Sequence, residues 1–256
     1  MPSDHFHAVM PGAEPASFPG GPNGALVLHG FTGSPQSMRG LATAFSAAGF
    51  TVELPLLPGH GTSVDDLATT TFADWSAAAE RAYADLAARC DRVVVAGLSM
   101  GALLTAWLAI RHAEIAGLVV INGVFAPIDA GLREAAEQVV AQGVTRIPGP
   151  GNDIADQSQT ELAYAEAPPE QFLSLFDAIE ALQDDLVKIR CPALVINSLQ
   201  DHVVPAGSSD HFAASVSGPV ERLDLTRSFH VATLDYERAD IETRSVEFAM
   251  KVTADA

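Results

Sequence analysis

Short apolar runs alternate with longer amphipathic stretches along most of this chain. The run from Val93 to Ala96 is rich in β-branched residues and carries no polar residue, which is typical of a strand buried on both faces. In a longer stretch, Phe72, Trp75 and Ala79 recur on one helix face, and Thr71 is placed to cap its start. These patterns predict strands at residues 25–29, 50–54, 92–97, 117–121, 193–197 and 220–225, and helices at about 35–48, 71–89, 100–112, 208–216 and 241–252.

Strands that alternate with helices in this way form a mostly parallel sheet covered by helices on both faces. The expected fold class is therefore α/β. Active sites of such sheets lie at the carboxyl ends of the strands, so residues that directly follow a strand are the first candidates for chemistry.

The alternation stops between about residues 124 and 185. Residues 130–142 have an amphipathic helical pattern, a run rich in helix breakers follows at 147–151, and Phe172, Phe176 and Ile179 return to helical spacing. We expect this insertion, residues 125–185, to form a cap over the strand ends, with residues 1–124 and 186–256 as the core. The alternative is ordinary surface helices packed on the sheet.

The charge of the chain narrows the range of partners. Asp and Glu total 32 and Lys and Arg total 14 among 256 residues, which gives a formal charge of −18. No cluster of basic residues is available to contact phosphates, so we expect no nucleic-acid partner and no basic patch that docks on anionic lipid. The hydrophobic share of 48% argues against intrinsic disorder.

One uncharged run of 18 residues, from Val93 to Ile110, has the nominal length of a membrane span. Two glycines interrupt it, so we expect a buried strand followed by a buried helix instead. The first residues lack the pattern of a signal peptide, and the only cysteines are Cys90 and Cys191. We therefore expect a cytoplasmic protein with reduced thiols.

The strongest chemical signal is Gly97-Leu98-Ser99-Met100-Gly101, which lies between a predicted strand and a predicted helix. A serine hydroxyl is a good nucleophile only when it is exposed and a neighbouring base takes its proton. A sharp turn from strand to helix exposes the hydroxyl above the sheet, and glycines allow the close approach that this turn needs. Ser99 is therefore the candidate nucleophile, with a helix cap as its alternative role.

A base and a residue that orients it are expected after later strands, in the order Ser, Asp, His. Asp201 follows the strand at 193–197, and His230 follows the strand at 220–225, 29 residues after Asp201. Both residues come just after a strand end, so their loops can be neighbours. His202 is the rival base, but its side chain is expected to point away from that of its neighbour Asp201.

Backbone amides complete the expected site, because the oxyanion formed in acyl transfer needs hydrogen-bond donors. One donor is the N–H of Met100, directly after the nucleophile. The other is expected in the loop at residues 29–33, with Phe31 as the first choice and Thr32 as the alternative. This loop lacks the glycine pattern of nucleotide-binding loops, and no group of residues has metal-ligand spacing, so we expect no cofactor and no metal.

Together these residues resemble the α/β-hydrolases, and within them the small bacterial carboxylesterases and monoacylglycerol lipases. The resemblance also covers the segments at 57–62, 71–75, 201–205 and 229–235, so it spans most of the chain outside the cap. It implies an α/β-hydrolase fold and a nucleophile at Ser99, with Asp201 and His230 as its partners. It also implies oxyanion donors at Phe31 and Met100.

Within the cap, residues 160–164, Thr-Glu-Leu-Ala-Tyr, resemble a segment of bacterial monoacylglycerol lipases in which the glutamate contacts the glycerol moiety. The resemblance implies that Glu161 binds the glycerol hydroxyls. Pro150 falls where those lipases tend to carry an apolar residue beside the glycerol, and Gln171 is a further candidate there. A solvated role for Glu161 is the alternative.

The resemblance implies a serine hydrolase that cleaves monoacylglycerols to glycerol and free fatty acid through an acyl-enzyme. The alternative is a general carboxylesterase for short and medium esters. The same triad also serves hydrolases of amides, lactones and thioesters, and the fold carries ligand receptors, which usually lack an intact triad. The expected partner is a small amphiphilic ester, the cap is a candidate for transient lipid contact, and the oligomeric state is left open.

Overall fold

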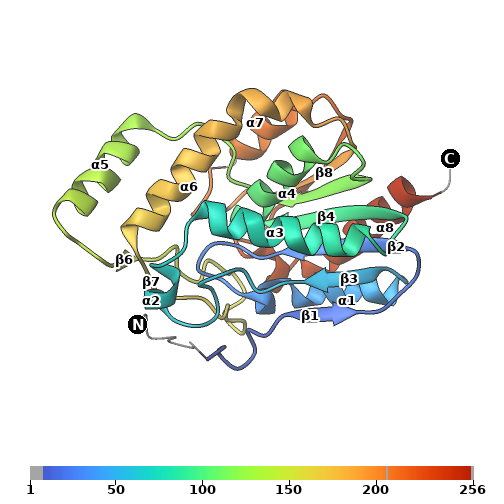
Figure 1. The fold of residues 1–256 in the computed structure, drawn as a ribbon, viewed down its shortest axis with the longest axis horizontal. Coiled ribbons are helices and arrows are strands. Elements are labelled where there is room, and N and C mark those ends of the chain that lie inside the picture. The colour runs from blue at the N-terminus through green and yellow to red at the C-terminus, as the bar shows by residue number, and fades with distance from the viewer. Residues whose placement is uncertain (1–7, 206, 255–256) are drawn as a thin grey trace.

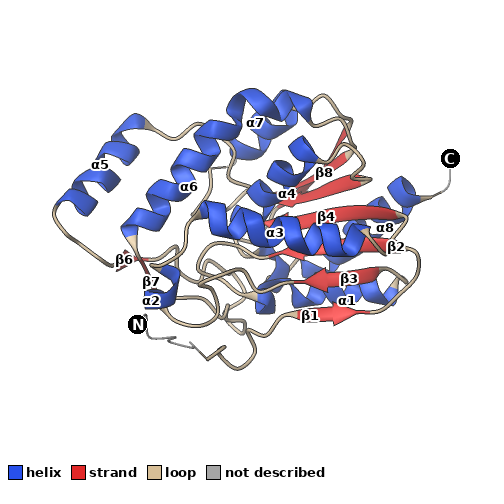
Figure 2. Ribbon diagram, viewed as in Figure 1, coloured by secondary structure: helices blue, strands red, loops and turns tan. Residues whose placement is uncertain are grey.

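The computed structural model describes residues 8–205 and 207–254. Within them a seven-stranded sheet runs in the order β1-β3-β2-β4-β5-β8-β9. Neighbouring strands are parallel except β1 and β3, whose arrows point in opposite directions in Figure 2. The strands are β1 (Ala16–Phe18), β2 (Asn23–Leu28), β3 (Thr51–Leu54), β4 (Arg92–Leu98), β5 (Gly117–Ile121), β8 (Ala193–Ser198) and β9 (Val220–Leu225).

Helices cover both faces of the sheet (Figure 1). The helices α1 (Arg39–Ala47) and α8 (Arg238–Thr253) pack on one face, and α3 (Phe72–Ala87), α4 (Met100–Arg111) and α7 (Gly207–Ser215) pack on the other. Along β2, Ala25 and Val27 contribute to the core under α1 and α8, whereas Leu26 and Leu28 contribute to the opposite core. The central strands β2, β4, β5 and β8 are thus buried on both faces, as their apolar runs predict.

Local chemistry explains where the elements begin. Thr71 caps α3 as predicted, because its side chain and that of Asp74 each bond the other residue's backbone N–H. The helix predicted at 35–48 is divided, since a 3₁₀ turn at Pro35–Met38 precedes α1. Several short elements were not predicted, among them the edge strand β1 and the one-turn helix α2 (Val64–Leu67), because they are too short to show a hydrophobic period.

The uncharged run at 93–110 is a strand followed by a helix, as expected. The strand β4 ends at Leu98 and α4 begins at Met100. In the sheet, Leu28 lies beside Gly97 and Leu98 lies beside Ile121, so β2, β4 and β5 end at the same level. No helix among the described residues is long and apolar enough to cross a membrane.

The predicted insertion lies between β5 and β8. It contains α5 (Ala130–Ala141), β6 (Ile147–Pro148), β7 (Glu166–Ala167), α6 (Pro169–Leu182) and a 3₁₀ segment at Gln183–Lys188. The strands β6 and β7 pair with each other and close a loop at residues 149–165, which we call the strap. Figure 1 shows α5 at the end of the molecule, with α6 between it and the sheet helices.

Candidate active site

Ser99 lies at the sharp turn between β4 and α4, with a backbone φ of 57°. This left-handed conformation is uncommon for a residue with a side chain and often marks a functional site. The Ser99 N–H donates to Ile121 O at 2.9 Å, and the Ser99 carbonyl accepts the first hydrogen bonds of α4. The hydroxyl does not cap the helix, so the side chain is available at the wall of a cavity.

The glycines around Ser99 are required by close packing. A Cβ atom at Gly97 would lie 2.2 Å from the backbone of Gly101, and one at Gly101 would lie 2.2 Å from Leu28 O. Strand, turn and helix therefore approach each other more closely than side chains would allow. The Gly-x-Ser-x-Gly spacing forms the turn that the sequence predicts.

Asp201 follows β8 and His230 follows β9, and their side chains form a buried pair. Asp201 Oδ2 lies 2.7 Å from His230 Nδ1, and the side chains are 2% and 7% exposed. The other carboxylate oxygen, Oδ1, accepts the N–H groups of Val203 and Val204, both at 2.8 Å. These bonds fix the carboxylate, which in turn orients the imidazole with Nε2 on the side away from Asp201.

Ser99 and His230 line the same cavity. Within the described part of the chain, no hydrogen bond joins the Ser99 hydroxyl to the imidazole. Such bonds are often long in ligand-free enzymes and shorten when the substrate binds. Apolar side chains supply much of the cavity wall, including Val124, Phe172, Leu175, Phe176 and Ile179.

The loop after β2 lies against Ser99. A Cβ atom at Gly30 would lie 3.5 Å from Ser99 Cβ, which is a contact distance. The ring of Phe31 packs on Phe172 and Trp75, with ring centroids 4.9 and 5.5 Å apart. The side chain of Phe31 therefore anchors the backbone that passes beside Ser99.

Two amides are the candidate oxyanion donors. Met100 is the first residue of α4, where N–H groups lack helical acceptors. The N–H of Phe31 donates no hydrogen bond among the described residues. Thr32, the alternative to Phe31, has a φ of 62°, and its carbonyl accepts the N–H of Tyr164 at 3.1 Å. The cap thus holds this loop through Thr32 and leaves the amides of Phe31 and Met100 available.

The sequence and the fold of this chain have counterparts among known proteins. A family model described as the alpha/beta hydrolase family matches residues 25–238. The chain belongs to the alpha/beta hydrolase family. It is 42% identical to the thermostable monoacylglycerol lipase of Bacillus sp. (strain H-257) over 246 residues, which are 96% of this chain and 97% of that protein.

Two further relatives of this hydrolase extend the comparison. A solved structure reported for LipS and LipT, two metagenome-derived lipolytic enzymes, matches it with a TM-score of 0.91 at 40% identity, over 95% of this chain and 100% of that chain. The carboxylesterase of Bacillus subtilis (strain 168) is 26% identical over 248 residues, which are 93% of this chain and 97% of that protein. The predicted family and the predicted fold class are confirmed.

Two buried histidines of the hydrolase support loops near Ser99. His29 Nδ1 donates to Gly30 O at 2.9 Å, and Nε2 accepts the Leu57 N–H at 3.1 Å. Burial, and then the proximity of His60, lowers the pKa of His29 to about 3. His60 donates to Pro58 O at 2.9 Å, and burial lowers its pKa to about 4. Both rings are therefore neutral at pH 7 and stabilise loops.

Glu161 of the strap reaches the cavity that Ser99 lines. A Cβ atom at Gly33 would lie 2.6 Å from Glu161 Oε1, so a glycine leaves room there for the carboxylate. Burial raises the pKa of Glu161 to about 7, although the charge of His230 and a hydrogen bond with Ser37 lower it. Near neutral pH this carboxyl can therefore both accept and donate hydrogen bonds.

Of the other two residues expected to contact the substrate, one lies at the cavity and one does not. Pro150 lines the cavity. Gln171 does not, because its buried side chain donates from Nε2 to Ala68 O at 3.1 Å and to Thr70 O at 3.0 Å. Gln171 thus ties α6 to the loop before α3, and its position gives no support to a role in substrate binding.

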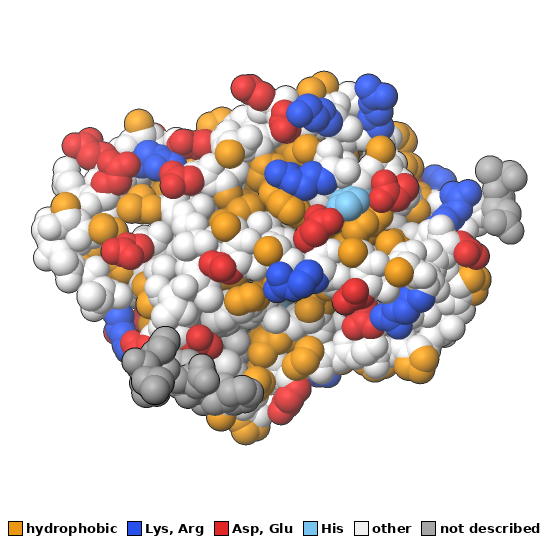
Figure 3. Space-filling view, viewed as in Figure 1, with side chains coloured by type: hydrophobic (Ala, Val, Ile, Leu, Met, Phe, Trp, Pro, Cys, Tyr) orange, Lys and Arg blue, Asp and Glu red, His pale blue; other side chains and the backbone are white. Residues whose placement is uncertain are grey.

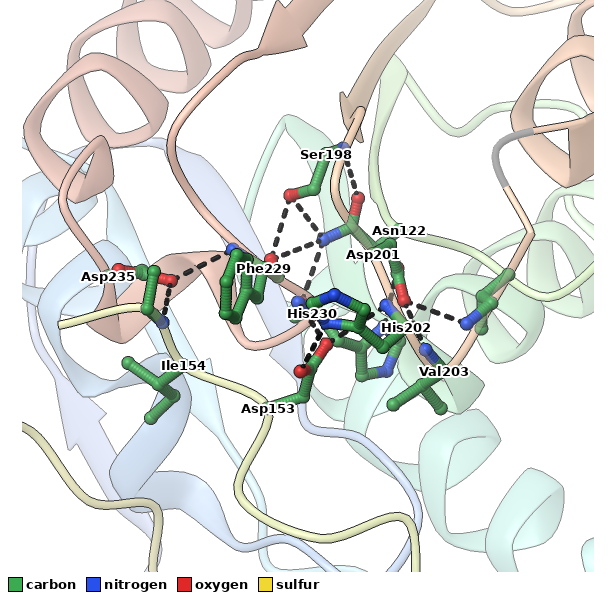
Figure 4. A network of polar contacts seen from close by, with 12 residues as sticks. Asn122, Asp153, Ile154, Ser198, Asp201, His202, Val203, Phe229, His230 and Asp235 are labelled. Carbon is green, nitrogen blue, oxygen red and sulfur yellow. Dashed lines mark hydrogen bonds and ion pairs between the residues drawn. The ribbon is translucent and has the colours of Figure 1, made fainter. Parts of the chain in front are cut away.

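Sequence reasoning missed the residues that hold the loops of the candidate catalytic residues Asp201 and His230 from outside (Figure 4). Asn122, with a φ of 44° after β5, donates from Nδ2 to His230 O at 2.7 Å. Asp153 in the strap accepts the His230 N–H at 3.0 Å, and Asp235 accepts the Phe229 N–H at 2.9 Å. Asp235 lies in the segment at 229–235 that the sequence singles out, whereas no pattern marks Asn122 or Asp153.

No cluster of three or more His, Cys, Asp or Glu side chains that could hold a metal ion occurs in residues 8–205 and 207–254. The site brings together a candidate nucleophile, a candidate base with its orienting carboxylate, and candidate amide donors. This set is suited to acyl transfer, in which a carbonyl carbon is attacked and an oxyanion forms.

Proposed function

We propose that this hydrolase cleaves monoacylglycerols to glycerol and a free fatty acid through an acyl-enzyme on Ser99. The observation that carries the proposal is the buried Asp201–His230 pair, 2.7 Å apart, whose imidazole lines the same cavity as Ser99 and Glu161. An apolar wall suits the acyl chain, and a carboxyl group suits the hydroxyls of the glycerol. The 42% identity to a thermostable monoacylglycerol lipase supports the same substrate.

In the acylation step, His230 takes the proton of the Ser99 hydroxyl, and Oγ attacks the ester carbonyl carbon. Asp201 stabilises the imidazolium that forms, because its carboxylate lies against Nδ1. The amides of Phe31 and Met100 donate to the oxyanion of the tetrahedral intermediate. When the intermediate collapses, the C–O bond to glycerol breaks and His230 gives its proton to the leaving oxygen.

In the deacylation step, a water molecule replaces the glycerol. His230 takes a proton from this water as its oxygen attacks the acyl-enzyme carbonyl, and the proton then passes to Ser99 Oγ as the second intermediate collapses. The fatty acid leaves and the hydroxyl is restored. The chain's own residues supply every proton transfer of the cycle.

The nucleophile is tested with Ser99→Ala. We expect turnover to fall by about 10⁶-fold without a change in fold, as in other triad knock-outs. The measurement is hydrolysis of a p-nitrophenyl ester and of a monoacylglycerol, with labelling by a fluorophosphonate and circular dichroism as the fold control. A Ser99→Ala protein that still hydrolyses esters at the parental rate would eliminate the mechanism.

The head-group role of Glu161 is tested with Glu161→Ala. We expect kcat/KM for a monoacylglycerol to fall by about 10-fold or more, because the loss of a hydrogen bond to a charged group costs about 1.5–3 kcal/mol. The rate on a p-nitrophenyl ester of the same acyl chain, which has no glycerol, should stay near the parental value. Equal losses on both substrates would instead favour a general carboxylesterase.

We also propose transient contact between the cap and lipid. Leu132 of α5 and Val144 after it are 53% and 38% exposed. Acidic side chains surround a basic one at the end of the molecule where α5 and α6 lie (Figure 3), so a neutral lipid surface fits better than an anionic one. Flotation with phosphatidylcholine vesicles should exceed flotation with phosphatidylglycerol vesicles, and no flotation with either would refute the contact.

For the location of the protein we propose the cytoplasm. Both cysteines are free, and burial raises the pKa of Cys191 to about 11, which keeps this thiol protonated and unreactive at neutral pH. Fractionation of the producing cells tests this proposal, and activity recovered in the medium would contradict it.

A further inference from the structure

A single carboxylate of the strap bonds both catalytic loops. Asp153 Oδ2 accepts the N–H of His230 at 3.0 Å and the N–H of His202 at 3.1 Å. Asp153 Oδ1 lies 2.8 Å from His202 Nδ1, and the Asp153 carbonyl accepts the N–H of Val231 at 3.0 Å. His202 directly follows Asp201, so Asp153 joins the loop of the orienting carboxylate to the loop of the base (Figure 4).

The main chain of the base is held from two sides. On the core side, Asn122 Nδ2 donates to His230 O at 2.7 Å, and Ser198 Oγ donates to Phe229 O at 2.8 Å. On the cap side, Asp153 accepts from the amide of His230. The core residues hold the carbonyls, and Asp153 is the side chain that holds the amide of His230.

Asp153 and its partner His202 differ in how far their side chains are exposed to solvent. The Asp153 side chain is 14% exposed, whereas that of His202 is 61% exposed. The His202 ring packs edge-on against Phe229 at a centroid distance of 4.5 Å and does not line the cavity. His202 is therefore a peripheral partner of Asp153, and the two backbone amides are the contacts that bear on the site.

The same stretch of the strap also reaches the substrate cavity. Pro150 and Gly151 line the cavity, and Asn152 Oδ1 accepts the N–H of Glu161 at 2.7 Å. Asn152 thus holds the residue proposed to bind the head group, and its neighbour Asp153 holds the base. Placement of the strap and placement of the imidazole are coupled through two adjacent residues.

We propose that Asp153 is a positioning residue of the active site, which fixes the His230 imidazole between Asp201 and Ser99 by accepting the amides of both catalytic loops. The proposal rests on the hydrolase function proposed above. Asp153 touches no reacting atom, so it acts through His230. A displacement of a catalytic group by about 1 Å can cost about 10²-fold in rate, so a support of this kind has a large kinetic effect.

The test compares Asp153→Ala with Asp153→Asn on a soluble p-nitrophenyl ester. The amide oxygen of asparagine can replace Oδ2 as acceptor for both N–H groups, whereas alanine leaves them without a partner. We expect Asp153→Ala to lower kcat by about 10²-fold, with KM changed little and the melting temperature lowered, because two amides lose their acceptor. The rate of fluorophosphonate labelling at Ser99 should fall in parallel, and Asp153→Asn should restore both rates to within a few-fold of the parent.

Two control variants isolate the contact. Asp156→Ala removes another acid of the strap, which is similarly buried but bonds Ser158 and Arg238 and neither catalytic loop, and should keep the parental kcat. His202→Ala removes the partner of Oδ1 and keeps the amide that Oδ2 accepts, so its effect should be much smaller than that of Asp153→Ala. If Asp153→Ala does not fold, Asp153→Ser, whose short hydroxyl cannot reach both amides, takes its place.

These measurements distinguish a failure of the positioning role of Asp153 from a failure of the proposed function. If the parent neither hydrolyses the ester nor labels at Ser99, the function is wrong. If the parent is active and folded Asp153→Ala turns over within a few-fold of it, the positioning role is wrong. The role is also wrong if Asp153→Asn is as slow as Asp153→Ala, or if only the melting temperature falls.

Discussion

Two parts of the cap, the helix α5 and the strap, differ in how firmly they are attached to the rest of the molecule, in a way that their secondary structure does not suggest. The helix α5 is regular for 12 residues, yet none of them is buried. The strap has no helix or strand, yet Ile154 and Tyr164 are buried and its polar groups bond the core. What fixes a segment is the set of bonds and contacts it makes to the rest of the molecule, rather than the regularity of its own backbone.

The strap is bonded to three loops at the site, those that carry Asp201, His230 and Phe31. Asp153 bonds the loops of Asp201 and His230, as described above. Tyr164 bonds the other side, because its N–H donates to Thr32 O at 3.1 Å and its hydroxyl donates to Gly59 O at 2.9 Å. A segment held at both ends in this way should open only at high free energy.

In contrast, α5 is tied to its neighbour through surface charges. Arg133 contacts Asp177 at 2.9 Å and Glu180 at 3.1 Å, both on α6, and these carboxylates are 69% and 48% exposed. Exposed pairs of this kind contribute about 0–1 kcal/mol each. We therefore expect α5 to open locally at low free energy, beside a strap that stays in place.

The largest expected effect comes from releasing the strap with Asp235→Ala. The buried carboxylate of Asp235 accepts the N–H groups of Ala155, Asp156 and Phe229, at 2.7, 3.0 and 2.9 Å. Each buried donor left without a partner costs about 1–3 kcal/mol, so we expect the free energy of unfolding to fall by about 3–5 kcal/mol. Urea denaturation measures this loss, and a turnover assay should show reduced kcat as well.

The matched control is Asp129→Ala at the start of α5. Asp129 Oδ1 also accepts a backbone N–H, that of Leu132, at 3.1 Å, and it is an N-cap on the helix. Loss of an N-cap costs about 0.5–2 kcal/mol locally, and kcat on a soluble ester should not change. Similar losses of stability and of turnover in both variants would show that strap and α5 are equally tied to the core.

The same contrast explains how much of the molecule could be predicted. The buried strands, the turn at Ser99 and the positions of Asp201 and His230 follow from apolar runs and from motifs that are local in sequence. The strap shows no hydrophobic periodicity. Its Asp153 bonds amides that lie 49 and 77 residues further along the chain. A carboxylate that recognises backbone N–H groups can serve any partner sequence, so neither the acid nor its partners carry a local signal.

Gln171 is the opposite case, a residue that the sequence analysis proposed for the site and that the structure places elsewhere. The resemblance to monoacylglycerol lipases made it a candidate for contact with the glycerol, yet its amide bonds the carbonyls of Ala68 and Thr70. Which face of a cap helix meets the cavity depends on how the helix packs on α3, and one amphipathic pattern does not specify that packing. In contrast, the resemblance correctly predicted that Glu161 lies at the cavity, because Glu161 belongs to a motif of five residues, 160–164.

A smaller effect is expected from Glu161→Gln, through the pH dependence of stability. Burial raises the pKa of Glu161 from 4.5 to about 7 in the folded protein. The folded state therefore binds this proton more tightly than the unfolded state, and the parent loses stability as the pH rises from 4.5 to 7. Glutamine cannot ionise, so the variant should gain about 1–3 kcal/mol relative to the parent across this range and keep the gain above pH 7.

The measurement for Glu161→Gln is the difference in the free energy of unfolding between variant and parent at several pH values. His29 and His60, whose lowered pKa values destabilise the fold below pH 6.5, act equally in both proteins and cancel in the difference. A difference that does not vary between pH 4.5 and 7 would mean that Glu161 is solvated, which was the alternative role for it.

The smallest effect on stability is expected from Arg133→Ala, which removes the charge that joins α5 to α6. Because the pairs are exposed, the free energy of unfolding should change by less than about 1 kcal/mol. Hydrogen exchange should nevertheless quicken in α5 and leave the strap amide of Tyr164 unchanged, since no contact of Arg133 reaches the strap. Turnover of a soluble ester should also stay at the parental rate. Faster exchange in both segments would mean that the cap opens as one unit, and the division between a fixed strap and a loosely held helix would fail.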